Sequence, residues 1–113
     1  MRICKQYFVY ECKDNYNILI FVYLEITVLE EGYDTFLKQQ QPKEFFTEQE
    51  LKSKNISLVN EWNIRCKNPS QYDPAIYEAP IDYSPTTDYG LNVECNIYMF
   101  LKFINEKYSL RLK

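Results

Sequence analysis

The chain has 113 residues, of which 46% are hydrophobic and 26% charged, and its formal net charge is −3 without any histidine. A chain of this length usually forms one domain, which we expect over residues 1–113. The lack of histidine excludes Cys-His and Ser-His nucleophile arrangements, so we expect a protein that is not an enzyme. The mild charge does not indicate a nucleic-acid or membrane surface.

Alternating apolar residues dominate the N-terminal part. The even positions of residues 18–28 are all aliphatic, and residues 3–12 form a second apolar run before the turn-forming residues 13–16. This pattern predicts two strands paired as an antiparallel hairpin. The apolar stretch 18–24 is much shorter than the roughly 20 residues of a membrane helix, and no signal sequence precedes it. We therefore expect a cytoplasmic protein.

Helical signals follow the hairpin. Residues 30–41 carry apolar side chains at helical spacing and stop before Pro42, which predicts one short helix. Thr47 and Glu50 have the spacing of a capping box, in which the Thr47 hydroxyl accepts a hydrogen bond from the Glu50 amide and the Glu50 carboxylate reaches back to the Thr47 amide. A helix is therefore predicted to begin at Glu48 and to end near Asn55.

The remaining chain alternates between apolar and polar residues in three segments, 56–66, 91–103 and 108–113. Such alternation is typical of strands. We expect an α+β fold of five mostly antiparallel strands in the order ββααβ, long loop, ββ, with one short helical segment. Both β-grasp-like and OB-like small barrels fit that order.

The cysteines give no indication of a metal site or a disulfide. Cys4, Cys12, Cys66 and Cys95 form no Cys-x-x-Cys pair, and no histidine could complete a ligand set. We expect thiols that act as small apolar residues in a reducing compartment, without a metal or cofactor.

The long segment 68–91, called the acidic loop from here on, separates the predicted third and fourth strands. No basic residue lies between Lys67 and Lys102, and the segment carries a charge of −4. The rest of the chain therefore sums to +1, the difference between −3 and −4. Four tyrosines and four prolines alternate with the acids. The predicted partner-binding residues are Tyr72, Asp73, Tyr77, Glu78, Asp82, Tyr83, Asp88 and Tyr89.

Loops of this length are uncommon unless they are functional or disordered. Tyrosine is enriched at interaction hot spots, and proline lowers the entropy lost on docking. The acidic loop therefore favours binding to a basic protein surface, for example that of a nucleic-acid-handling enzyme. The alternative is an ordered loop that only covers the edge of the sheet.

The leading functional hypothesis is a small protein-binding module of the inhibitor, immunity or anti-defence kind, for which charge and size are the only argument. An accessory subunit of a larger assembly is compatible with the same features. A different class, a single-stranded nucleic-acid or small-ligand binder, would use an aromatic sheet face made of Phe21, Tyr23, Tyr98 and Phe100. Glu25, Glu61 and Glu94 could pair as carboxylates, but acids on a strand usually form its solvated face.

Overall fold

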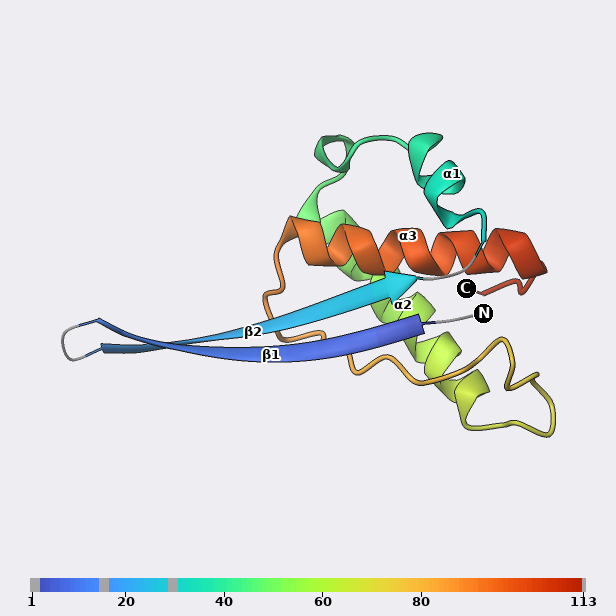
Figure 1. The fold of residues 1–113 in the computed structure, drawn as a ribbon, viewed down its shortest axis with the longest axis horizontal. Helices are drawn as coiled ribbons and strands as arrows, with labels where there is room; N and C mark the ends of the chain where they lie inside the picture. The colour runs from blue at the N-terminus through green and yellow to red at the C-terminus, as the bar shows by residue number, and fades with distance from the viewer. Residues whose placement is uncertain (1–2, 15–16, 29–30, 113) are drawn as a thin grey trace.

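The computed structural model describes residues 3–14, 17–28 and 31–112, with side chains from residue 31 onward. Two long strands are followed by a short helix, a 3-10 turn and two long helices (Figure 1). The elements are β1 (Ile3–Asp14), β2 (Asn17–Val28), α1 (Tyr33–Lys38), η1 (Lys43–Phe45), α2 (Glu48–Cys66) and α3 (Leu91–Tyr108).

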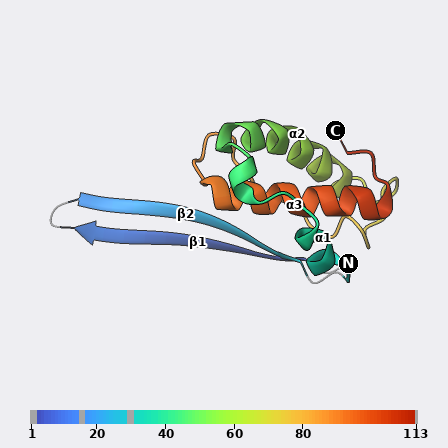
Figure 2. The same ribbon diagram turned by 90° about the horizontal axis from the view of Figure 1, so that it is seen from above.

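The two strands form one antiparallel hairpin, in a register that pairs Ile3 with Val28 and Asp14 with Asn17. The C-terminal end of β2 contacts α3. The other end of the hairpin projects well beyond the helices, as two views at right angles show (Figures 1 and 2).

Helix α3 is the centre of the helical part, with α2 packed on one side and β2, α1 and η1 around the rest. Its buried residues are Val93, Glu94, Cys95, Ile97, Met99, Phe100, Leu101, Phe103 and Ile104. The Trp62 ring of α2 meets the Phe100 ring edge-on, with 5.5 Å between centroids, and neither residue is exposed to solvent. A helix that is apolar around most of its circumference is stable only when other elements cover it in this way.

The predicted α+β fold of five strands is wrong. In the described part of the chain the only sheet is the two-stranded hairpin, and no β-grasp-like or OB-like barrel forms. Residues 56–66 continue α2, which therefore ends at Cys66 and not near Asn55. Ile56 and Ile64, which the alternation placed in the core, are 40% and 45% exposed.

The residues that α2 buries differ from those that the strand-like alternation predicted to be buried. Its buried residues are Leu51, Asn55, Val59 and Trp62. Their spacing of three or four residues places them on one face of a helix. A buried asparagine in that face obscured the pattern in the sequence.

The strands predicted over 91–103 and 108–113 are also absent. Residues 91–108 form α3, where apolar residues on several sides of a covered helix imitate alternation. The helix ends at Tyr108 and is capped by Ser109, which has a left-handed φ of 51°. The chain then turns back, since the amides of Leu110 and Leu112 donate to the carbonyl and side-chain oxygens of Asn105 at 3.1 and 2.9 Å.

The helix starts were predicted more successfully. α1 lies inside the predicted range 30–41. α2 begins at Glu48 as predicted, and the Thr47 hydroxyl accepts from the Glu50 amide at 3.1 Å. The structure describes both residues but does not show the predicted return bond from the Glu50 carboxylate to the Thr47 amide, and this carboxylate lies 3.6 Å from the Lys54 ammonium instead.

Candidate functional site on the acidic loop

The acidic loop has no helix or strand before α3 begins at Leu91, and side chains of α2 hold its backbone in place. The Trp62 indole donates to the carbonyl of Ala79 at 2.9 Å. The Asn63 side chain binds both backbone groups of Ile81, donating to its carbonyl at 2.8 Å and accepting from its amide at 2.7 Å. Buried backbone groups need such partners, and here a helix provides them for a loop.

Arg65, near the end of α2, joins the acidic loop to the C-terminal tail. Its guanidinium donates to the Tyr77 hydroxyl at 2.9 Å and to the Leu110 carbonyl at 2.6 Å. It also donates to Glu61, one turn earlier on α2, at 2.9 Å. The guanidinium carbon lies 5.0 Å from the centre of the Tyr72 ring, within the range of a cation–π contact. This arginine therefore connects three separate segments.

The tyrosines of the acidic loop pack against the protein itself. Tyr77 is 6% exposed, and its ring centroid lies 5.0 Å from that of Trp62 and 5.6 Å from that of Tyr72. Tyr83 and Tyr89 stack on each other at 5.3 Å. The Tyr89 hydroxyl accepts a hydrogen bond from the Ser84 amide at 2.9 Å. Four rings that the sequence offered for a partner thus have contacts inside the chain.

A buried polar cluster lies beneath the second half of the acidic loop. Glu94, in the first turn of α3, has no exposed surface. Its Oε1 accepts from the Tyr83 hydroxyl at 2.7 Å and from the Asn55 amide at 3.0 Å. Its Oε2 lies 3.2 Å from the Lys52 ammonium. Asn55 also donates to the Glu94 backbone carbonyl at 2.8 Å.

Lys52 connects this cluster to the loop backbone, because its ammonium also donates to the Thr87 carbonyl at 2.6 Å. It lies over the Tyr83 and Tyr89 rings, 5.7 and 5.6 Å from their centroids. Burial, followed by the hydrogen bond to Glu94, raises the pKa of Tyr83 far above its usual value. The Tyr83 hydroxyl therefore stays protonated and remains a donor at physiological pH.

The four acids of the acidic loop, Asp73, Glu78, Asp82 and Asp88, are exposed. The Asp73 carboxylate accepts from the Ala75 amide at 2.9 Å, an arrangement that stabilises a local turn. The loop thus turns its tyrosines inward and its carboxylates outward.

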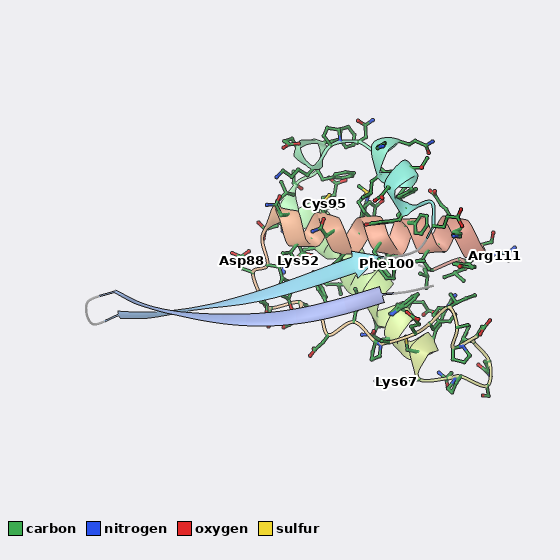
Figure 3. All side chains as sticks on the ribbon, viewed as in Figure 1. Lys52, Lys67, Asp88, Cys95, Phe100 and Arg111 are labelled. Atoms are coloured by element: carbon green, nitrogen blue, oxygen red, sulfur yellow. The ribbon has the colours of Figure 1, made fainter. Side chains whose placement is uncertain are left out.

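One acid lies close to a carboxyl group outside the acidic loop. A hydrogen bond shared with Asp88 raises the pKa of Glu48, the first residue of α2. These two residues line an open pocket of about 500 Å³ together with Lys52 and Thr87. Figure 3 shows Lys52 and Asp88 near the beginning of α3, whereas Lys67 lies at the far end of α2. The negative surface thus extends from the loop onto the start of α2.

The structure brings only some of the predicted residues together. Tyr83 and Tyr89 form one group with Lys52, and Tyr72 and Tyr77 form another with Arg65. Partner binding by all eight residues stays a prediction.

Sequence reasoning missed Lys52, Asn55 and Glu94. It placed Glu94 on a solvated strand face, but the residue is completely buried. No motif indicates this cluster, and only the correct helical period would have placed Lys52 and Asn55 one turn apart.

The aromatic face of the alternative hypothesis does not form as predicted. Tyr98 and Phe100 belong to α3 and not to a strand, and Phe100 is completely buried. The side chains of Phe21 and Tyr23 lie outside the part that the structure describes, as do those of Cys4 and Cys12. Cys66 and Cys95 are thiols, and burial raises the pKa of Cys95. Within residues 31–112 no group of three or more histidine, cysteine or acidic side chains is placed to hold a metal ion.

The chain belongs to a family of unknown function, DUF6146, whose model matches residues 22–113. The match covers the second half of β2 and everything after it, including the whole acidic loop. Comparisons with curated proteins and with solved structures found no match. Among the described helices, none combines the length and apolar character needed to cross a membrane.

Proposed function

We propose that this protein is a non-catalytic binding module that presents the acidic loop to a basic surface of another protein. The observation that carries the proposal is the division of the loop between inward tyrosines and outward carboxylates. Hydrogen bonds from Trp62, Asn63 and Arg65 fix that arrangement before any partner arrives. A surface that is ordered in advance loses less entropy on binding than a flexible loop would.

The buried cluster supports a role in positioning the loop over a role in proton transfer. The Glu94 carboxylate is surrounded by Lys52, Asn55 and Tyr83, which meet both of its oxygens. A general acid or base has to reach a substrate proton within hydrogen-bond distance. A carboxylate with no exposed surface, already paired with a cation, is poorly suited to that task.

The partner class follows from charge. Exposed acids accelerate encounter with a basic surface, and the Glu48–Asp88 pair would be relieved by a cationic side chain. An inhibitor, immunity or anti-defence protein that covers the basic site of a nucleic-acid-handling enzyme has this property. The thiols Cys66 and Cys95 agree with a cytoplasmic location, which is part of the same proposal.

The test is capture of partners from the native host, with mass spectrometry and a nucleic-acid control, followed by kinetics on the captured protein. The loop variant combines Asp73→Asn, Glu78→Gln, Asp82→Asn and Asp88→Asn. The matched control makes the same charge change at exposed acids elsewhere, with Glu31→Gln, Asp34→Asn, Glu44→Gln and Glu106→Gln.

The loop variant should associate at least about tenfold more slowly at low salt, with a flatter salt dependence, whereas the control should lose much less. Equal losses in the two variants would show an effect of net charge alone. Unchanged association of the loop variant would refute the acidic loop as the binding surface.

A further inference from the structure

A groove between α2 and α3 has a character opposite to that of the acidic loop. It is lined by Lys54, Ser57 and Leu58 from α2 and by Tyr98, Leu101 and Lys102 from α3. Its volume is about 360 Å³, which lies within the range of small-molecule sites. The groove shares no lining residue with the pocket at Glu48 and Asp88. We call it the lysine groove.

The inner surface of the lysine groove is apolar. Leu101 is completely buried, while Leu58 and Tyr98 are partly exposed beside it. The Tyr98 ring packs edge-on against the Phe46 ring, with 5.8 Å between the centroids. Apolar surface in a concave site that is in contact with water favours binding of an apolar ligand, because covering this surface lowers the free energy.

The charges on the rim of the groove are positive. The Lys54 ammonium lies 5.4 Å from the centre of the Tyr98 ring, and the Lys102 ammonium donates to the Gln40 side chain at 2.8 Å. None of the residues described as lining the groove is acidic. Lys54 is paired with Glu50 at 3.6 Å, and the side chains of the two residues are 46% and 49% exposed. Such exposed pairs are weak, so Lys54 can exchange Glu50 for another carboxylate at little cost.

We propose that the lysine groove binds a small amphipathic carboxylate, an unbranched acyl chain with one anionic end. The chain would cover the exposed parts of Leu58 and Tyr98, above the buried Leu101, and the carboxylate would lie between Lys54 and Lys102. An inorganic anion would leave the apolar surface uncovered, and a cationic amphiphile would be repelled by both lysines. This site is independent of the proposed function of the acidic loop.

The experiment titrates decanoate into the intact protein and follows the backbone amide resonances by NMR. Decyltrimethylammonium, which has the same chain length and the opposite charge, is the ligand control. Lys54→Gln and Lys102→Gln test the rim, and Lys67→Gln is the matched protein control because Lys67 is exposed at the far end of α2 (Figure 3). Ser57→Trp tests the location, because a large side chain at this exposed position would fill the groove.

Decanoate should shift resonances around Tyr98 and Lys102. Each rim variant should weaken binding about two- to fivefold, as expected for one exposed charge pair. Lys67→Gln should leave the affinity unchanged, Ser57→Trp should abolish the shifts, and the cation should bind much more weakly.

Absence of shifts, equal binding of the two amphiphiles, or unchanged binding to Ser57→Trp would each overturn the proposal. A titration with an acidic amphipathic peptide tests whether the groove binds a peptide and not a small carboxylate. If that peptide shifts the same resonances and decanoate does not, the groove is a peptide site and the proposal is wrong.

Discussion

The acidic loop and helix α3 are neighbours in the chain and share one apolar core, but the loop has more hydrogen bonds to side chains of α2. α3 is fixed by apolar burial on several sides, with Phe100 and Ile104 completely enclosed. The acidic loop also buries Tyr77 and Ile81 in the core. In addition, polar side chains of α2, among them Asn63 and Arg65, hydrogen-bond to its backbone or its tyrosines. The polar face of α2 is thus an internal contact surface for much of its length.

This difference has a consequence for stability. Loss of apolar contacts around α3 should weaken the whole domain, because every helix packs against it. Loss of a hydrogen bond from α2 should loosen the loop locally, because local opening requires less free energy than global unfolding. Single substitutions in each region test this distinction.

Phe100→Ala should give the largest loss. It leaves a cavity against Trp62 and should lower the free energy of unfolding by about 3–5 kcal/mol. Chemical denaturation followed by circular dichroism and tryptophan fluorescence should show one cooperative transition shifted as a whole. Phe45→Ala is the control, because Phe45 is 65% exposed and its removal should have little effect. A loss below about 1 kcal/mol at position 100 would contradict the central place of α3.

Lys52→Met should cost less, up to about 3 kcal/mol, because it leaves the buried Glu94 carboxylate without its cation while Lys52 itself is partly exposed. The double variant Lys52→Met/Glu94→Gln should recover part of this loss in thermal unfolding. Lys54→Met, which breaks an exposed pair with Glu50 and a contact with the Tyr98 ring, is the control. Additive losses in the double variant would show that Lys52 and Glu94 do not interact.

Thr47→Ala should destabilise the protein by about 1 kcal/mol, since it removes the hydroxyl that accepts from the Glu50 amide. Thr47→Ser keeps that acceptor and should remain close to wild type. Equal losses in the two variants, measured by denaturant titration, would mean that the cap does not stabilise α2.

The smallest expected effect concerns the titration of Glu48. The hydrogen bond shared with Asp88 raises the pKa of Glu48, so the folded state favours the protonated form. The stability from this pair is therefore present at low pH and is lost as pH rises through the raised pKa. Asp88→Asn should lower the Glu48 pKa toward its usual value, which side-chain NMR can measure. An unchanged pKa in this variant would show that the two carboxyl groups do not interact.

The sequence revealed local signals more reliably than long-range ones. The Thr47 cap and the start of α2 were predicted correctly because a capping box depends on only four neighbouring residues. The pairing of residues 3–14 with 17–28 likewise follows from a short turn between two apolar runs.

The helical character of residues 56–66 and 91–108 could not be read from alternation. In α3 apolar residues occur on several sides because β2, α2 and α1 cover different faces. In α2 the buried Asn55 interrupts the apolar stripe. Asn55 can be buried because it hydrogen-bonds to Glu94, which lies 39 residues later in the chain. Tertiary contacts of this kind determine which residues are buried and so whether a segment is helical, and they cannot be read from a single sequence.

The measurement that tests the central claim most directly is hydrogen exchange at the Ile81 amide. This amide donates to the Asn63 side chain at 2.7 Å, so it should exchange slowly in the wild-type protein. In Asn63→Ala its protection should fall by about tenfold, the value of one buried hydrogen bond, while amides of α3 keep theirs. Rapid exchange in the wild type, or a fall shared equally by α3, would contradict the claim that α2 holds the acidic loop in place.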